Sequence, residues 1–375
     1  MKRVGNAFKG ILGGFVFILI GIVLLWWNEG NNVRNIKTTA EMDKIVVDVP
    51  SDKVDSANEG KLVATHGKVI NEEEMFDETF NVKVQTPIMK RVVEVYQWDE
   101  DSDTDEDGHT TYSYKKVWDT DIIDSGNFHD KNKVNPKTKP YEDQVYTSKD
   151  VSVGAFSLTD EQISTLSTKA DYTNFDLETA NKLNLTASSK YLTTSKNLDS
   201  PSIGDVRISF AYNDSSELSV LAVQSGNSFV DFVSSAGKNV NRVMDGSHSG
   251  HDMINVIKKE NNFIKWLLRF LGTILIIGGI GAILKPISAI TSYVPLLGSL
   301  VGAAVGLVSM LLGLALSFVV IAIAWVRWRP VLGISLLVGA AVLIVFLIMR
   351  GKKSKKPTDT PVQQEQPVQE ENTQQ

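Results

Sequence analysis

The sequence contains no cysteine, and that absence excludes several kinds of chemistry. Without a thiol the chain has no cysteine nucleophile, no disulfide bond and no thiolate ligand for a metal. A protein without disulfides can lie on either side of a membrane, so the missing cysteines do not assign a compartment.

The sequence also lacks the common short motifs of catalysis and nucleotide binding. It contains no P-loop, no dinucleotide-binding glycine fingerprint and no His-Glu-x-x-His motif. The segment 246–250 has the flanking glycines of a nucleophile elbow, but His248 stands where that motif requires serine. We therefore expect no enzymatic activity, no catalytic residues and no cofactor.

Nothing in the charge of the chain points to nucleic acid as a partner. The formal net charge is −6, and the middle block 28–262 is rich in acidic residues. A protein that binds nucleic acid needs a basic surface to neutralise phosphates. We expect no nucleic-acid partner.

Acidic residues are absent from three long apolar runs near the C-terminal end, at 263–284, 298–326 and 331–349. A helix needs about 20 residues to cross the hydrocarbon core of a bilayer, and each run has that length. A fourth apolar run, Gly10–Trp27, follows a basic N-terminus and has no small-x-small cleavage site after it. We interpret it as an uncleaved first crossing.

Basic residues at both termini predict the orientation of these crossings. Lys2, Arg3 and Lys9 precede the run Gly10–Trp27, and the basic segment 350–356 follows the run 331–349. Both clusters favour the cytoplasm, which requires an even number of crossings, here four. Fewer basic residues lie on the expected outer side: Lys258, Lys259, Lys265, Arg327 and Arg329.

The sequence therefore predicts a multi-pass α-helical membrane protein of four crossings. A large β-rich α+β domain, extracytoplasmic or lumenal, is expected between crossings one and two. We divide the chain into a cytoplasmic N-terminus with the first transmembrane helix at 1–27, the soluble β-rich domain at 28–262, three transmembrane helices at 263–349 and a disordered cytoplasmic tail at 350–375.

The outer domain is predicted as mainly β with a short helical insert. Asp99–His109 is so acidic that we expect it to be an exposed hairpin loop, with aromatic side chains paired across the flanking strands. Thr159–Gln162 matches a capping box, so a helix is expected to begin near Asp160, and a second short helix is expected at 176–183. Branched and aromatic runs between turn residues predict strands at 46–49, 61–69, 79–84, 91–98, 111–118, 206–212, 218–224 and 229–233.

Two sets of residues are candidates for membrane-specific roles. Gly298, Gly302 and Gly306 are spaced four apart, which places them on one helix face and lets another helix approach closely, so we predict helix packing there. Five of the seven tryptophans stand at the ends of the proposed crossings, where an amphipathic ring suits the lipid–water boundary. The predicted interface anchors are Trp26, Trp27, Trp266, Trp325 and Trp328.

Two segments resemble parts of metal sites. Asp103–Gly108 begins like a calcium-binding EF-hand loop, but Tyr114 stands at the twelfth position, where a bidentate glutamate is needed. His248 and His251 are three residues apart, but no third histidine accompanies them. A solvated hairpin tip and a polar linker explain these segments better, so we predict no metal site.

Two further functional classes remain open as alternatives. A transporter or pore would be lined by the glycines together with Ser288, Thr291 and Ser309. Ionisable groups at mid-membrane depth usually mark such a path, and the crossings hold none there. A hydrolase in the outer domain would need one of the histidines His66, His129 and His248 beside a serine and a carboxylate.

Several segments, taken together and in order, resemble the transmembrane protein 43 family, also called LUMA. They cover nearly the whole chain except the tail. The resembling segments are Trp27–Gly30, Asn58–Leu62, Val93–Trp98, Tyr112–Tyr114 with Trp118, Ile123–Ser125 with Phe128, Asn135–Pro136, Gly204–Arg207, and Ala324–Trp325 leading to Arg329–Pro330.

The resemblance implies four crossings, cytoplasmic termini and a large domain between the first two crossings, with no agreed catalytic residues. Animal members reside in the endoplasmic reticulum and inner nuclear membrane, and associate with themselves, emerin and lamins. The short lysine-first N-terminus and the Gln-rich tail of this chain look bacterial. For a bacterial member we expect the cell membrane, where lamin-type partners do not carry over.

The expected role is a non-enzymatic integral membrane scaffold that organises membrane protein complexes or lipids. Its expected partners are membrane lipids, other membrane proteins and further copies of the same chain, as a homo-oligomer.

Overall fold

The structure is a computed structural model. It describes residues 2–104, 109–291, 297–331, 333–335, 338 and 342. The chain divides into two compact units, Met1–Val320 and Ile321–Gln375. Among the described residues, three helices are long and apolar enough to cross a membrane. Most of the fourth predicted crossing, 331–349, lies outside the described residues, so the number four stays a prediction.

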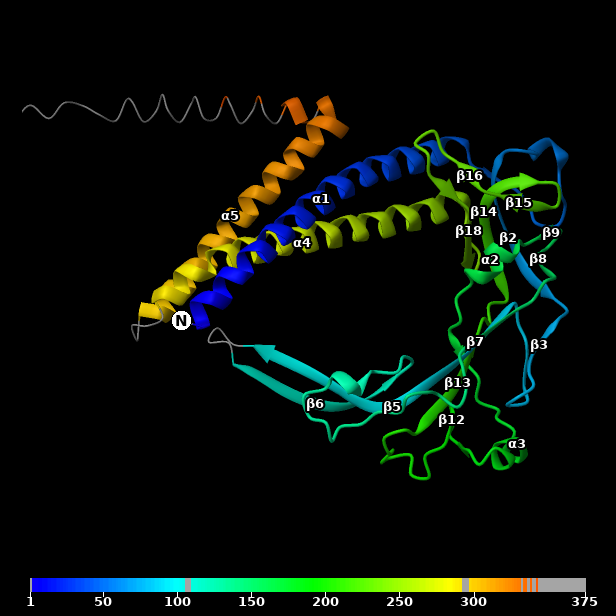
Figure 1. The fold of residues 1–375 in the computed structure, drawn as a ribbon. Coiled ribbons are helices and arrows are strands. Elements are labelled where there is room, and N and C mark those ends of the chain that lie inside the picture. The colour runs from blue at the N-terminus through cyan, green and yellow to red at the C-terminus, as the bar shows by residue number, and fades with distance from the viewer. Residues whose placement is uncertain are drawn as a thin grey trace, which may run out of the picture. The chain divides into compact units, whose positions relative to one another are not determined.

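Two of these helices form an antiparallel pair (Figure 1). Helix α1 spans Lys2–Ile45 and helix α4 spans Gly250–Thr291, so both continue far beyond their apolar runs. The predicted soluble domain at 28–262 therefore begins and ends with helix, up to Ile45 and from Gly250. Polar helices of this kind are marginal alone and depend on packing for stability, which each provides for the other.

The first sheet of the β-rich body has strand order β15-β14-β2-β8-β9. Strand β14 pairs along one side with β2, and its other neighbours are β15 and β18, while β1 pairs in parallel with β2. Its core includes Val63, Val153, Phe156 and Val220, none of them exposed. The strands are β1 (Val47–Asp48), β2 (Leu62–Asn71), β8 (Val151–Val153), β9 (Phe156–Ser157), β14 (Glu217–Ser225), β15 (Ser228–Val230) and β18 (Arg242–Asp245).

The second sheet has strand order β11-β12-β13-β5-β6, with β10 and β7 added to β13 and β5. Residues of β13 alternate between buried and partly exposed, as expected for a strand with one face on a core. Phe210 of β13 and Phe80 pack edge to face in that core, with ring centroids 5.8 Å apart. The strands are β5 (Ile88–Thr104), β6 (Thr110–Asp119), β7 (Gln144–Thr147), β10 (Ala170–Asp171), β11 (Thr186–Ala187), β12 (Leu192–Thr193) and β13 (Val206–Tyr212).

The hairpin β5–β6 corrects one prediction about the acidic segment Asp99–His109. Pairing continues to Thr104↔Thr110, so most of the segment is strand and not loop, although its end is exposed as predicted. Partners across the hairpin compensate part of the acidic charge, since Asp99 makes an ion pair of 3.1 Å with Lys115 and Glu100 accepts from Tyr114. Residues 105–108, which contain most of the EF-hand-like stretch, are outside the described residues.

One aromatic pair across this hairpin is confirmed. Tyr96 and Trp118 are direct cross-strand partners, with ring centroids 5.1 Å apart. The partner of Trp98 in the ladder is Lys116, whose ammonium lies 5.1 Å from the indole centroid, so that contact is cation–π.

Short helices and two small hairpins complete the body. Helix α2 (Asp160–Ser164) has the predicted capping box, since Thr159 and Gln162 each bond the other's backbone. Helix α3 (Leu177–Lys182) matches the second predicted helix. The remaining elements are the hairpins β3 (Glu74–Asp77) with β4 (Val82–Gln85) and β16 (Phe232–Val233) with β17 (Asn239–Val240), and the 3₁₀ turns Ser56–Asn58 and Ser125–Asn127.

The helix pair and the first sheet share one apolar cluster. Met42 of α1 and Met253 of α4 are fully buried in it. Polar contacts surround the junction, because Asp48 accepts from the Gly250 backbone at 2.6 Å and Asp43 pairs with Lys258 at 2.5 Å. The remaining buried members are Leu62, Ala64, Leu221, Phe232 and Ile254.

Helix α5 (Leu297–Trp328) is the third helix able to cross a membrane. In the first unit it meets α4 at Gly313, where an added Cβ would collide with Ile277. In the second unit the helix ends ahead of Pro330, and an added Cβ at Gly333 would lie 2.6 Å from the Val326 nitrogen.

Candidate functional site: the helix pair at the membrane boundary

The α1–α4 pair is held together by glycines that meet backbone to backbone. A Cβ added at Gly14 would lie 2.6 Å from the Gly279 carbonyl oxygen, and one added at Gly21 would lie 2.8 Å from the Gly272 carbonyl oxygen. On each helix the two glycines are seven residues apart. This spacing keeps them on one seam of a coiled helix pair.

The same seam continues beyond the apolar runs with asparagines in place of glycines. Asn28 donates to the Lys265 carbonyl at 3.0 Å, and Asn35 donates to the Asn261 side chain at 2.8 Å. These positions follow Gly21 at intervals of seven. A buried asparagine on such a seam fixes the register of a helix pair at some cost in stability.

A buried ion pair lies at the change from glycine to asparagine. Glu29 accepts from Arg269 Nε at 2.6 Å, and their side chains are 1% and 14% exposed. The Arg269 guanidinium also lies 4.8 Å from the Trp266 ring centroid. Removing one member of such a pair leaves the other charged and desolvated, so the pair specifies how the two helices align.

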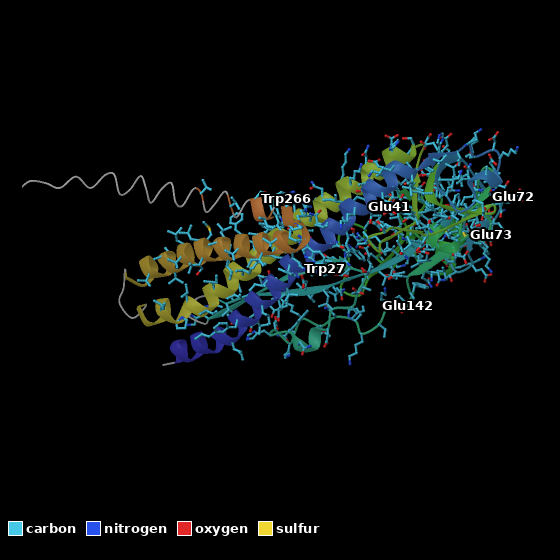
Figure 2. The ribbon with its side chains drawn as sticks, turned by 90° about the horizontal axis from the view of Figure 1, so that it is seen from above. Trp27, Glu41, Glu72, Glu73, Glu142 and Trp266 are labelled. Atoms are coloured by element: carbon cyan, nitrogen blue, oxygen red, sulfur yellow. The ribbon has the colours of Figure 1, made fainter. Side chains whose placement is uncertain are left out.

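Two tryptophans place the expected lipid–water boundary on this pair. Trp27 of α1 is 51% exposed and Trp266 of α4 is 58% exposed. Both are labelled in Figure 2, where they lie along the helix pair between its apolar end and the β-rich body. Trp26 is 37% exposed, and Trp325 and Trp328 are partly buried on α5. The anchoring role of all five stays a prediction.

Gly306, one of the three glycines predicted for helix packing, makes no close contact within the described part of the chain. Nothing lies within 4 Å of a Cβ added at Gly306, and the surroundings of Gly298 are outside the described side chains. A role for Gly298, Gly302 and Gly306 between copies stays a prediction.

The close glycine contacts of α1 and α4 were missed because the pattern of four-residue spacing was sought within a single run. The signal that could have found them is a spacing of seven residues between glycines, which is present both in the run 10–27 and in the run 263–284. It becomes meaningful only when two runs far apart in the sequence are compared as antiparallel partners.

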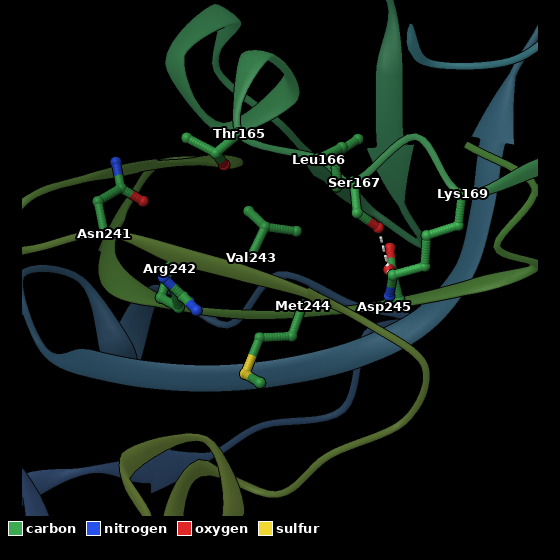
Figure 3. Close-up of a pocket in the computed structure, with 9 residues that line it drawn as sticks. All are labelled: Thr165, Leu166, Ser167, Lys169, Asn241, Arg242, Val243, Met244 and Asp245. Atoms are coloured by element: carbon green, nitrogen blue, oxygen red, sulfur yellow. Dashed lines mark hydrogen bonds and ion pairs between the residues drawn. The ribbon is translucent and has the colours of Figure 1, made fainter. Parts of the chain in front are cut away.

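A second candidate is a polar pocket at the edge of the first sheet (Figure 3). Its volume is about 320 Å³, and strand β18 and the segment after α2 line it. The Asp245 carboxylate accepts hydrogen bonds from Ser167 and from Lys169 Nζ, the latter at 2.9 Å. Asn213, which does not line the pocket, donates to the same carboxylate at 2.9 Å. Burial alone would raise the pKa of Asp245, but these hydrogen bonds outweigh it and lower the pKa to about 2.

This pocket lacks the arrangement that acid–base or nucleophilic catalysis requires. No histidine is among the residues that line it. Ser167 donates a hydrogen bond to Asp245, whose pKa of about 2 makes it too weak a base to remove the serine proton near neutral pH. Asp245 instead closes the pocket as a structural acceptor.

Two of the histidines considered in the sequence, His66 and His248, lie near each other, because His66 contacts the residue next to His248. His66 Nδ1 lies 2.9 Å from Ser247 Oγ in an exposed contact, and no carboxylate hydrogen-bonds to His66 among the described residues. His248 contacts the Asp245 carbonyl, and His251 pairs with Asp43. Across the described part of the chain no three His, Cys, Asp or Glu side chains form a metal-binding group.

The residues of the pore alternative are also partly described. Ser309 is 2% exposed and donates to the Val305 carbonyl of its own helix at 2.7 Å. The side chains of Ser288 and Thr291 lie outside the described set.

The sequence of the chain matches a known family of membrane proteins. The chain is 26% identical to human transmembrane protein 43 and 25% identical to the mouse protein, in each case over 95% of this chain and 93% of the relative. It is 27% identical to the Drosophila melanogaster homolog over 88% of this chain and 92% of that one. No solved structure matches. Residues 95–330 match the sequence model of the family described as Transmembrane protein 43, so the chain belongs to that family.

Proposed function

We propose that the protein is a non-enzymatic integral membrane scaffold. It self-associates and holds its β-rich body at a fixed position relative to the bilayer, where the body meets other membrane proteins. For a bacterial chain the membrane is the cell membrane, and for an animal-like one the endoplasmic reticulum or inner nuclear membrane.

The observation that carries this proposal is the unbroken helix pair between membrane and body. Contacts in one antiparallel register run from Gly14–Gly279 through Glu29–Arg269 to Asp43–Lys258. The pair then enters the core of the first sheet through Met42 and the other members of the shared cluster. A flexible linker would leave the body free to reorient, whereas packed helices transmit position.

Self-association is supported by the exposed apolar surface of α5. The Gly306 position is open, while Gly313, seven residues along, is occupied by Ile277 of the same chain. Small residues on an open membrane-helix face allow a second helix to approach closely.

Because the chain has no native cysteine, this proposal can be tested by single-cysteine crosslinking in native membranes. Gly306→Cys is expected to give a disulfide-linked dimer on oxidation. Ser317→Cys is the matched control on the same helix, and it should stay monomeric because Ser317 is 3% exposed.

Only monomer from both variants, together with no partner captured by a lysine crosslinker, would contradict the scaffold role. Solute flux in reconstituted liposomes that is lost in Gly302→Trp would favour the pore alternative instead. Turnover of an ester or amide by the purified protein would contradict the absence of enzymatic activity.

A further inference from the structure

A small polar cavity lies between α1 and α4 directly beyond the boundary tryptophans. Its volume is about 140 Å³, far more than the roughly 10–15 Å³ that a single water requires. Amide, hydroxyl and ammonium side chains, including those of Asn32, Asn262 and Lys265, line it together with Ile36 and the apolar stems of the longer side chains. A cavity of this size has room for a group larger than one water.

Asn32 lines this cavity with an amide that makes no hydrogen bond to any described residue. The residue as a whole is 6% exposed. The neighbouring seam residues Asn28 and Asn35 are both bonded to α4. The amide atoms of Asn32 are not fully enclosed by the protein, so a group that enters the cavity can reach them and satisfy them.

The cavity lies at the depth of lipid head groups. With a rise of 1.5 Å per residue, Asn32 is about 8 Å beyond Trp27 along α1. The head-group layer adds roughly 5–8 Å to each side of the hydrocarbon core. Lys265 directly precedes Trp266, and its Nζ donates to Asn262 Oδ1 at 2.6 Å at the edge of the cavity.

The charge around the cavity is positive in a protein of net charge −6. The segments 28–43 and 255–269 contain six basic and four acidic residues. Three of the acidic side chains are in ion pairs, Glu29 with Arg269, Asp43 with Lys258 and Glu260 with Arg242. The excess of basic residues favours an anion.

We propose that this cavity binds the phosphate group of an anionic membrane lipid. Lys265 provides the cation, and the amide nitrogens of Asn32 and Asn262 donate to phosphate oxygens. Lys258, at the far end, is paired with Asp43 and helps to close the cavity. The site adds a ligand to the proposed scaffold and does not depend on self-association.

The test uses the full chain in phosphatidylcholine nanodiscs that also contain phosphatidylglycerol. Native mass spectrometry counts the phosphatidylglycerol that stays on the released protein, and the shift in Tm with this lipid gives a second readout. Lys265→Gln and Asn32→Leu are each expected to lower its retention on the order of ten-fold, from the loss of one charge-assisted or buried hydrogen bond. Lys259→Gln removes the same charge from an exposed position of α4 and should retain the lipid.

Three outcomes would overturn the site. An equal loss of phosphatidylglycerol retention in Lys259→Gln and Lys265→Gln would indicate that the lipid is attracted to the protein surface in general and not to this cavity. Oleate retained as well as phosphatidylglycerol would remove the role of phosphate, and displacement by inorganic phosphate would assign the cavity to a soluble anion. If Asn32→Leu lacks wild-type helical circular dichroism, the two lysine variants decide the test. Crosslinked dimers without lipid retention would leave the scaffold role intact.

Discussion

Glu29 on α1 accepts a hydrogen bond from Arg269 on α4 at 2.6 Å, although 240 positions separate them in the sequence. Because the glutamate side chain is almost fully buried, the contact is available only when the helices are aligned in one register. Glycines close the seam on one side of this pair and asparagines continue it on the other. The ion pair therefore lies at the point where membrane packing gives way to polar packing.

Arg269→Ala is expected to destabilise the folded protein by about 3–5 kcal/mol, because it removes the guanidinium that pairs with the buried Glu29 carboxylate. The measurement is thermal unfolding of the full chain in nanodiscs. Arg242→Ala breaks the Arg242–Glu260 pair, whose side chains are 40% and 48% exposed, and should change the free energy of unfolding by only about 0–1 kcal/mol. Similar Tm losses in both variants would mean that burial of Glu29 does not matter.

Gly279→Ala and Gly278→Ala are expected to have opposite effects, although they are adjacent on α4. At Gly279 the new Cβ would lie 2.6 Å from the Gly14 carbonyl oxygen, and the backbones must separate, at a cost of about 1–3 kcal/mol. At Gly278 nothing lies within 4 Å, so alanine gains up to about 1 kcal/mol of helix propensity. Thermal unfolding in nanodiscs measures both, and equal Tm values would contradict the seam.

Local signals in the sequence predicted much of the β-rich body. The strand at Val206–Tyr212 was predicted to the residue, because alternation and branched side chains are properties of the segment itself. The capping box of Thr159 and Gln162 was also confirmed, since it needs only four consecutive residues. Such features can be recognised from a few consecutive residues.

Features that depend on a distant partner were not predictable in the same way. The acidic end of β5 looked like a loop because its charge was considered alone, whereas Asp99 is neutralised by Lys115 and Glu100 accepts from Tyr114 at 2.5 Å. The glycine seam and the ion pair likewise need α1 and α4 to be aligned before either can be recognised. The unmet amide of Asn32 is visible only from the packed structure.

Asn35→Cys combined with Asn261→Cys is expected to be bridged within the chain by a short bis-methanethiosulfonate crosslinker, because the hydrogen-bonded side chains leave a gap slightly too wide for a direct disulfide. The two side chains are hydrogen-bonded at 2.8 Å, and no native cysteine competes. Asn35→Cys with Leu271→Cys is the control, because Leu271 lies about 15 Å further along α4 than Asn261. A protease cut within the β-rich body followed by a non-reducing gel shows the crosslink, and crosslinking of the control pair instead would contradict the register.

Asp245 predicts how stability changes in acid. Burial alone would raise its pKa, but hydrogen bonds from Ser167, Lys169 and Asn213 outweigh burial and lower the pKa to about 2 in the folded state. An unfolded aspartate has a pKa of about 3.9, so the contribution of Asp245 is complete above about pH 4 and is lost as the pH falls towards 2.

Asp245→Asn is therefore expected to lower Tm near neutral pH and to flatten the fall in Tm between about pH 4 and pH 2, measured by circular dichroism of the full chain in detergent. Asp214→Asn removes a negative charge from an exposed neighbouring position and should keep the wild-type slope. An unchanged slope in Asp245→Asn would mean that other carboxylates dominate the acid transition, and that the hydrogen bonds around the pocket do not hold β18 in place.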